Sequence, residues 1–358
     1  MALSFGALMP LSHVLRGSAR GNEPVMFRSH LHTVALRPES RRQSWCSTCL
    51  LAMSTAAAVR QTRQCELRVR EEDRRKCSAE VMLDFERKGF LRMPEILSPE
   101  EVSSVRKTVY AVRSSDECVL QGLRHQIRVQ FGAEDARACS DVAACRAKLR
   151  GLEKRGQISF LQYFNLHRRS KKLREVATSP RLAFWASRLL GVPRVRLYQD
   201  SLFEKRPGDG ATDWHSDLGL APFDTNSFLT IWLPLTSISA KGSSLVYAIG
   251  SHRDFALPFH GDMDEDLSGR YKLHRTGVIH PGDATVHHGW TLHSSTGVPR
   301  AGPLRLAWTL GFVADGARLL RKGELWDCED AVSYEDWARE LGPGARVDHP
   351  MVPLLPEA

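Results

Sequence analysis

The sequence has no stretch of about 18 uncharged apolar residues, the length at which a segment becomes a candidate membrane-spanning helix. A membrane span is therefore not expected. The chain also lacks the cysteine spacing of a small secreted domain, because its eight cysteines are scattered over 358 residues. We expect these cysteines to be reduced thiols, which indicates an intracellular compartment.

Lysine is absent and acidic residues are scarce in the first 70 residues, which hold ten arginines and three glutamates. This leader carries a net charge of +7 out of +9 for the whole chain, so only +2 remains for residues 71–358. Because the remainder has no large basic surplus, a nucleic-acid partner is not expected.

The composition of the leader, residues 1–70, is rich in Arg, Ser and Ala and poor in acid. It is typical of a mitochondrial or plastid transit peptide rather than of a folded unit. A disordered tail on a cytoplasmic protein, or a true start at Met26 or Met53, would have the same composition. The C-terminal Leu-Pro-Glu-Ala is not a peroxisomal address of the Ser-Lys-Leu type.

Periodic structure is expected from about residue 78, and it begins with helices. Val81, Met82 and Phe85 form an apolar helical stripe. The run Ser98-Pro99-Glu100-Glu101 predicts a helix start with a capping box, and residues 180–190 predict a helix that ends at Gly191. Residues 115–155 are also expected to be helical.

From residue 194 onward the pattern changes to short strands separated by Gly, Pro and Asp. Strands are expected over residues 195–203, 228–235, 243–247, 283–287 and 304–313. In the second of these, Phe228, Thr230 and Trp232 fall on one face, and the leucines and Ile231 fall on the other. Helices followed by antiparallel strands predict an α+β domain over residues 78–350.

The run Trp214-His215-Ser216-Asp217 is the first candidate for chemistry. Alternation along a strand would point His215 and Asp217 to the same side, where both can bind one ion. Two imidazoles and one carboxylate on one face of an octahedron leave three positions open, which is the arrangement of non-haem iron(II) oxygenases. The tripeptide alone occurs often by chance, so it indicates a metal site only in combination with a third ligand elsewhere in the chain.

Two later features complete the pattern. A Pro-Gly-Asp turn leads into a segment with three histidines, His287, His288 and His293, and the spacing does not choose which of them is a metal ligand. Arg305 opens the apolar strand after this segment. An arginine at a core-facing strand position is costly unless it meets an anion, which a dicarboxylate cosubstrate would supply.

The chain resembles the phytanoyl-CoA dioxygenase family of 2-oxoglutarate oxygenases over roughly residues 78–350. The matching segments, in order along the chain, are residues 89–91, 97–101, 183–191, 196–207, 214–217, 228–235, 242–251, 281–295 and 304–307. The resemblance implies that iron(II) is bound by His215, Asp217 and His293. It also implies that Arg305 binds the distal carboxylate of 2-oxoglutarate.

The same resemblance suggests Trp232 and Ser295 near the cosubstrate, and Gln199 from the strand that precedes the metal loop. Trp232 is equally well explained as a plain core aromatic. The resemblance further implies a double-stranded β-helix, a jelly-roll-like pair of sheets flanked by N-terminal helices. The implied reaction uses dioxygen, releases succinate and carbon dioxide, and hydroxylates or desaturates its substrate, since Asp217 argues against halogenation.

The alternatives are a Jumonji-like protein hydroxylase, a cupin-like metalloenzyme that does not use 2-oxoglutarate, and a catalytically silent binding member of the same fold. Arg305 and the order of the family segments count against the cupin-like enzyme. The complete set of His215, Asp217, His293 and Arg305 counts against the silent member. The expected partner is a small-molecule or acyl substrate, and the expected state is a monomer or a weak homo-oligomer.

Overall fold

The structure, a computed structural model, describes residues 67–239, 242–254, 267–321 and 329–357. The leader expected over residues 1–70 lies outside the described residues, apart from its last four. Of these, Leu67 is already buried in the main core. No helix of the described part is long and apolar enough to cross a membrane.

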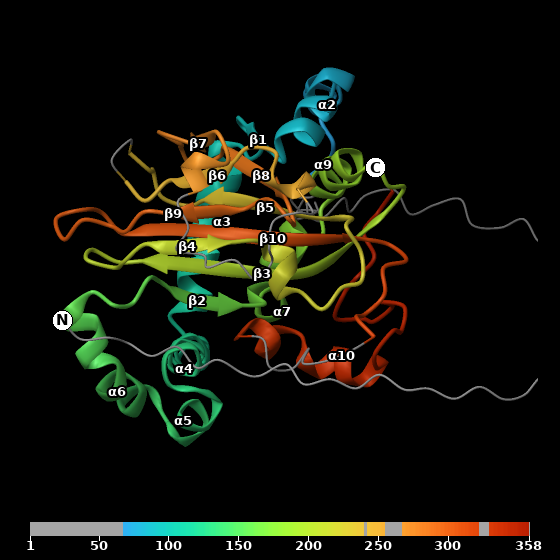
Figure 1. The fold of residues 1–358 in the computed structure, drawn as a ribbon. Coiled ribbons are helices and arrows are strands. Elements are labelled where there is room, and N and C mark those ends of the chain that lie inside the picture. The colour runs from blue at the N-terminus through green and yellow to red at the C-terminus, as the bar shows by residue number, and fades with distance from the viewer. Residues whose placement is uncertain (1–66, 240–241, 255–266, 322–328, 358) are drawn as a thin grey trace, which may run out of the picture. The chain divides into compact units, whose positions relative to one another are not determined.

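The N-terminal half of the described chain is mainly helical (Figure 1). Its helices, with one more near the C-terminus, are α1 Glu71–Lys76, α2 Ala79–Lys88, α3 Pro99–Arg113, α4 Asp116–Phe131, α5 Ala133–Ala138, α6 Val142–Arg155, α7 Leu166–Arg169, α8 Lys171–Ala177, α9 Pro180–Leu190 and α10 Glu335–Leu341. Four 3-10 turns are η1 Asp217–Leu220, η2 Ser251–Arg253, η3 Leu267–Gly269 and η4 Glu329–Ser333.

The helix signals of the sequence are confirmed. Ser98 caps α3, and its backbone N–H donates to the Glu101 carboxylate at 2.7 Å, which completes the capping box. Helix α9 ends at Gly191, whose φ of +63° lies in the left-handed region that glycine adopts without a Cβ clash.

The strands form two antiparallel sheets. The strands are β1 Phe90–Met93, β2 Leu161–Phe164, β3 Val195–Lys205, β4 Thr212–His215, β5 Phe228–Pro234, β6 Leu245–Ala248, β7 Leu273–Arg275, β8 Ala284–His288, β9 His293–Ser295 and β10 Arg305–Ala314. The large sheet has the order β1-β8-β5-β10-β3-β2, and the small sheet has the order β4-β9-β6-β7. The predicted α+β class and all five predicted strands are confirmed, with ends that differ by one to two residues.

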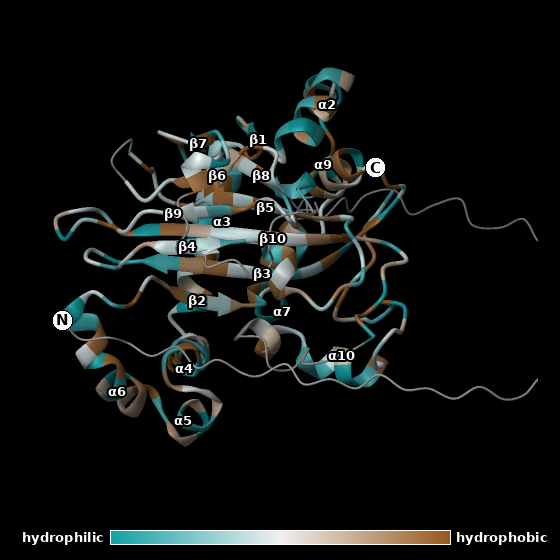
Figure 2. Ribbon diagram, viewed as in Figure 1, coloured by the Kyte–Doolittle hydropathy of each residue, from teal (hydrophilic) through white to brown (hydrophobic). Residues whose placement is uncertain are grey.

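The two faces of β5 show how the large sheet is used. Leu229, Ile231 and Leu233 belong to the main hydrophobic core, where the sheet packs against residues of α3, α8 and α9. Thr230 and Trp232 point the other way and line a cavity between the sheets. Figure 2 shows apolar residues along the strands and mixed apolar and polar residues on helices such as α2 and α6. The sheet therefore buries one face in the core and offers the other face to a ligand.

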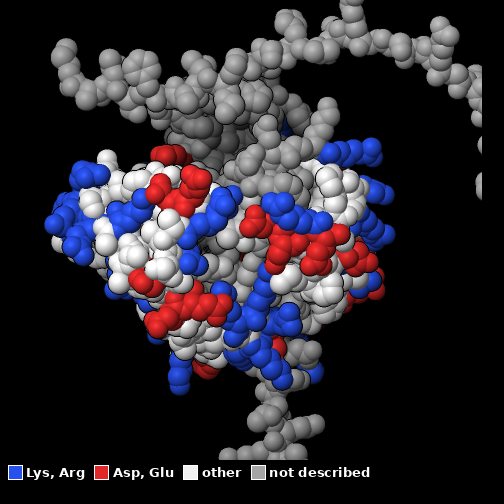
Figure 3. All heavy atoms as spheres, turned by 90° about the horizontal axis from the view of Figure 1, so that it is seen from below, with Lys and Arg blue, Asp and Glu red and all other residues white. Residues whose placement is uncertain are grey.

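The surface of the described part carries both signs of charge. Figure 3 shows lysine and arginine side chains interspersed with aspartate and glutamate side chains on one face of the molecule. This mixture agrees with the small net charge expected for residues 71–358.

Candidate active site

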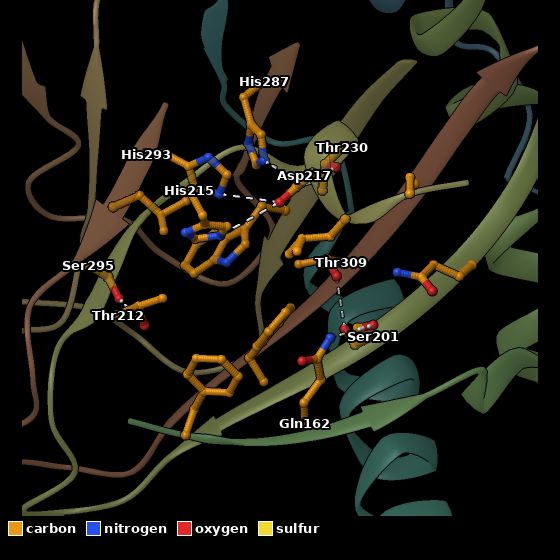
Figure 4. A pocket seen from close by; sticks show the side chains of 18 of the residues that line it. Gln162, Ser201, Thr212, His215, Asp217, Thr230, His287, His293, Ser295 and Thr309 are labelled. Carbon is orange, nitrogen blue, oxygen red and sulfur yellow. Dashed lines mark hydrogen bonds and ion pairs between the residues drawn. The ribbon is translucent and has the colours of Figure 1, made fainter. Parts of the chain in front are cut away.

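A cavity lies between the two sheets. The space between its walls is about 780 Å³, a figure that includes solvent at the open mouth. Strands β3, β5, β8 and β10 of the large sheet and β4, β6 and β9 of the small sheet all contribute side chains to its wall. Figure 4 shows the pocket and its labelled polar side chains.

His215, Asp217 and His293 come together on one wall of this cavity (Figure 4). Asp217 Oδ1 lies 3.7 Å from His215 Nε2 and 3.5 Å from His293 Nε2. Ligands about 2.1 Å from an ion and at right angles to each other are about 3 Å apart, so a small contraction of these three atoms would close an octahedral face. The residues present therefore fit an iron(II) ion.

Backbone carbonyls orient both imidazoles toward this point. His215 Nδ1 lies 2.8 Å from the Asp213 carbonyl oxygen, and His293 Nδ1 lies 3.0 Å from that of Thr291. Each Nδ1 therefore carries the proton and donates it, which leaves the lone pair of Nε2 on the side of the cavity. Strand pairing of β4 with β9 sets His215 opposite His293, with ring centroids 4.2 Å apart.

Asp217 is held by its other carboxylate oxygen. Oδ2 accepts a hydrogen bond from Thr230 Oγ1 at 2.5 Å and from His287 Nε2 at 2.9 Å. Burial alone would raise the pKa of Asp217, but the hydrogen bond that its carboxylate accepts from His287 outweighs burial and lowers this pKa. The carboxylate is thus ionised and presents Oδ1 to the metal position.

Burial lowers the pKa of His293 well below its ordinary value. A neutral imidazole is the form that binds a metal ion, so burial prepares this side chain for ligation.

The strand argument for His215 and Asp217 needs a correction. Strand β4 ends at His215, and Asp217 opens the 3-10 turn η1. Ser216 between them is extended, with φ −123° and ψ 135°, so the side chains still share a side although only one of them lies in a strand. The turn then carries the chain away from the metal position.

The three histidines have three different roles. His293 is in the triad, and His287 supports Asp217 from β8. His288 lies outside the cavity lining and accepts a hydrogen bond from the backbone of Trp290 at 3.2 Å. His252, in the turn that begins at Gly250, contacts the Glu86 carbonyl at 2.8 Å instead of the metal position.

Arg305 is a buried cation that meets no anion among the described residues. It is 6% exposed and lines the same cavity. Its Nε has no hydrogen-bond partner, and within the described part of the chain no carboxylate pairs with its guanidinium. Its guanidinium lies 5.0 Å from the centre of the Trp232 ring. Burial lowers the pKa of Arg305 to about 10, so it is still charged at neutral pH and fits a carboxylate ligand.

The remaining predicted site residues all line the cavity, at different distances from Arg305. Trp232 contacts it directly, and the Ser295 hydroxyl donates to Thr212 Oγ1 at 3.1 Å. Gln199 lies opposite Gly311 on β10, whereas Arg305 lies opposite Lys205. The six positions between Gln199 and Lys205 correspond to about 20 Å along β3, so Gln199 is at the far end of the cavity.

Two supporting residues were missed by sequence reasoning. Thr230 was placed on the correct face of β5, but nothing in the sequence pairs its hydroxyl with Asp217. The Tyr247 hydroxyl lies 3.1 Å from His287 Nδ1 and 3.0 Å from Thr285 Oγ1. The alternation of β6 and β8 was the available signal, but it fixes only which face a residue takes and not what it contacts.

Solved structures share this architecture. The non-heme alpha ketoglutarate dependent carbocyclase SnoK from nogalamycin biosynthesis is 19% identical, with a TM-score of 0.57 and coverage of 78% of this chain and 96% of SnoK. The epimerase SnoN from the same biosynthesis is 20% identical, with a TM-score of 0.56 and coverage of 77% and 97%. EctD from S. alaskensis with 2-oxoglutarate and 5-hydroxyectoine is 20% identical, with a TM-score of 0.51 and coverage of 70% and 82%. These likenesses confirm the double-stranded β-helix.

In sequence, no curated protein matches the chain. The phytanoyl-CoA dioxygenase (PhyH) family matches residues 85–299, which is more than half of the chain. The matched range contains all three members of the His-Asp-His cluster. The chain therefore belongs to the phytanoyl-CoA dioxygenase (PhyH) family of iron(II)- and 2-oxoglutarate-dependent non-haem oxygenases.

Proposed function

We propose that this oxygenase binds iron(II) through His215, Asp217 and His293, binds the distal carboxylate of 2-oxoglutarate through Arg305, and hydroxylates a small-molecule or lipid-derived substrate. The observation that carries this proposal is Arg305. A buried guanidinium without an anion is unfavourable by itself, and a dicarboxylate in the same cavity as the triad removes that cost.

Each residue has a distinct task in this proposal. The two imidazoles and Asp217 Oδ1 would hold the metal and would leave its remaining positions to the cosubstrate and dioxygen. His287 and Thr230 fix the carboxylate so that it does not rotate when the ligands change. Arg305 and the Trp232 ring orient the cosubstrate from its distal end. When bound, iron(II) and 2-oxoglutarate supply the oxidising chemistry, with dioxygen consumed and succinate and carbon dioxide released.

The first experiment is anaerobic addition of iron(II) and 2-oxoglutarate to the purified protein, with measurement of the visible charge-transfer band of the chelate. We expect the band in the wild-type protein and its loss in Asp217→Ala. The matched control is Asp213→Ala, the same change four residues away at an exposed side chain, which should retain the band. A band that survives in Asp217→Ala would contradict the assignment of the ligands.

The second experiment addresses turnover. Succinate release with candidate substrates distinguishes an active oxygenase from a catalytically silent binding member. Chelate formation without any substrate-dependent succinate release across neutral, acyl and peptide substrates would support the silent member.

We also propose a targeting role for residues 1–70, most of which lie outside the described part of the chain. Their composition supports a leader that directs the domain at residues 78–350 to a mitochondrion or plastid. A fusion of residues 1–70 to a fluorescent protein should enter the organelle. Diffuse fluorescence would contradict the leader.

A further inference from the structure

The wall of the cavity across from the metal position carries uncharged hydrogen-bonding groups. Gln162 Nε2 donates to Ser201 Oγ at 3.3 Å, and Thr309 Oγ1 donates to the Ser201 carbonyl at 3.1 Å. Figure 4 shows Gln162 and Ser201 on the side opposite His215 and His293. We call Gln162, Ser201 and Thr309 the amide shelf. All three side chains are buried and line the cavity.

The amide of Gln162 is oriented from behind. Its side chain hydrogen-bonds His125 of α4, whose ring packs edge-on against Phe164 at 4.9 Å. Burial lowers the pKa of His125 to about 4, so this imidazole is neutral at physiological pH. Contacts to His125 and Ser201 fix the rotation of the amide. A fixed amide can donate to, or accept from, one particular position of a ligand.

The charges of the loaded cavity cancel. Iron(II) and Arg305 contribute three positive charges, and Asp217 and the dicarboxylate contribute three negative charges. No further charged side chain lines the cavity within the described residues. A charged substrate group on the amide shelf would have no counter-charge. Burial of an unpaired ion is unfavourable, so such a group would bind weakly there.

Aromatic residues flank the amide shelf. Phe160 and Phe203 meet with ring centroids 5.1 Å apart, and Tyr198 meets Phe228 at 5.9 Å. Gly311 lies between the latter two, where a Cβ would be only 3.1 Å from the Phe228 ring. The absence of a side chain at Gly311 leaves room for these two rings, which meet edge to face. Aromatic side chains of this kind suit an apolar ring.

We propose that the substrate is an uncharged cyclic molecule that carries a hydroxyl or carbonyl group, and that the amide shelf binds this group and so selects the carbon that faces the metal. This inference rests on the proposed function. It names the class of substrate: a neutral ring compound, in contrast to a carboxylate, a zwitterion or an amine at this position. Gln162 is the specificity-determining residue.

The test uses three probes that share one ring system and differ in charge: 2-naphthol, 2-naphthoate and 2-naphthylmethylammonium. Binding is measured anaerobically by calorimetry with protein saturated with iron(II) and 2-oxoglutarate, so that the anion cannot occupy the Arg305 site. We expect 2-naphthol to bind at least about tenfold more tightly than either charged probe. Equal binding of the three probes, tighter binding of a charged probe, or binding of none would overturn the inference.

Two variants locate the selectivity. Gln162→Glu keeps the shape of the side chain and adds a negative charge, so it should reverse the preference toward the ammonium probe. The matched control is Gln130→Glu on α4, outside the cavity lining, which should leave the preference unchanged. Thr309→Val removes one hydroxyl at constant shape and should weaken 2-naphthol binding by about fivefold. If Gln162→Glu does not fold, as judged by circular dichroism, Thr309→Val tests the inference instead. Unchanged 2-naphthol binding in Thr309→Val would then overturn it.

The chelate band, recorded in the same samples, separates the two proposals. A normal band without selectivity for the neutral probe would overturn the substrate class and leave the proposed function intact. Absence of the band from the wild-type protein would overturn the proposed function itself.

Discussion

Two buried arginines in this molecule have opposite surroundings. Arg181, on α9, is 5% exposed and donates to the carboxylate of Glu101 at 2.8 Å and to the carbonyls of Arg68 and Ile96 at 3.0 Å. Arg305, in the cavity, is 6% exposed and has no carboxylate beside it in the described part of the chain. The two side chains are equally buried, so burial does not distinguish them.

The difference in hydrogen-bond partners indicates a different role for each arginine. The partners of Arg181 belong to the chain itself. Through them this side chain links α9 to α3 and to the segment before α1. Arg196 is similar, since Asp315 lies 2.8 Å from its Nε. No carboxylate of the described residues pairs with Arg305, and we propose that 2-oxoglutarate is its partner. A structural cation and a ligand-binding cation can therefore be separated by their contacts, and variants at each should affect different properties.

The largest effect is expected at Arg181. Arg181→Met should lower the free energy of unfolding by about 3 kcal/mol, because Glu101 and the buried Asp73 lose a partner. Urea denaturation monitored by circular dichroism measures this change. The affinity of the folded variant for 2-oxoglutarate should equal that of the wild-type protein. A loss of cosubstrate affinity without a loss of stability would contradict the structural role of Arg181.

The second largest effect is expected at Arg305, where it should change the affinity for 2-oxoglutarate. Arg305→Lys should weaken 2-oxoglutarate binding by at least about tenfold, because one ammonium cannot replace the two parallel hydrogen bonds of a guanidinium, each worth about 1.5–3 kcal/mol. Titration of the chelate band measures it, with the exposed Arg300→Lys as the matched control. Arg305→Leu should abolish tight binding yet leave the unfolding free energy of the cosubstrate-free protein no lower than wild type. A strong destabilisation by Arg305→Leu would mean that Arg305 is structural.

A third buried basic side chain, Lys205, gives a pH test. Its amino group donates to the backbone carbonyls of Gly210 at 2.8 Å and Thr296 at 3.3 Å, and burial lowers its pKa from 10.5 to about 6. Between these values the unfolded chain holds a proton that the folded chain does not, so stability rises with pH. The slope from this group is at most about 1.4 kcal/mol per pH unit.

Lys205→Met removes this titration. The variant should gain most over the wild-type protein near pH 6, and the gain should shrink as the pH rises by about three units toward the pKa of the unfolded chain. Urea denaturation across this range measures the difference. A difference that stays constant with pH would show that Lys205 keeps its proton in the folded protein.

The smallest effect is expected at Trp232. Trp232→Leu removes the ring that lies against the guanidinium of Arg305 and should weaken 2-oxoglutarate binding about threefold, which corresponds to a cation–π contact of about 0.7 kcal/mol. The chelate titration measures it again. No change in affinity would support the plain core role of Trp232.

The strands and the pair His215 and Asp217 could be predicted from the sequence because both leave local patterns, whereas His293 was predicted only from the family resemblance. The alternation in β5 put Thr230 and Trp232 on one face, which lines the cavity in the structure, and the capping box predicted the start of α3. The supporting contacts around Asp217 left no such pattern. His287, Thr230 and Tyr247 come from three different strands, and their meeting depends on sheet order, which hydrophobic periodicity does not encode.

The amide shelf illustrates the same limit. Gln162 lies in β2, a four-residue strand that no sequence pattern predicted. The proposed binding role of Gln162 becomes visible only in the structure, where β2 pairs with β3 and brings the amide beside Ser201. The orienting contact with His125 adds a helix that precedes the strand in the chain. Local propensity carries no information about such a combination.

The central claim is that one metal ion binds where His215, Asp217 and His293 meet, with a cosubstrate carboxylate on Arg305. Anomalous diffraction at the iron edge, from crystals grown anaerobically with iron(II) and 2-oxoglutarate, tests it most directly. We expect a single strong peak about 2 Å from both Nε2 atoms and from Asp217 Oδ1, with the distal carboxylate paired to the Arg305 guanidinium. A peak elsewhere in the molecule, or a cosubstrate whose distal carboxylate does not contact Arg305, would contradict it.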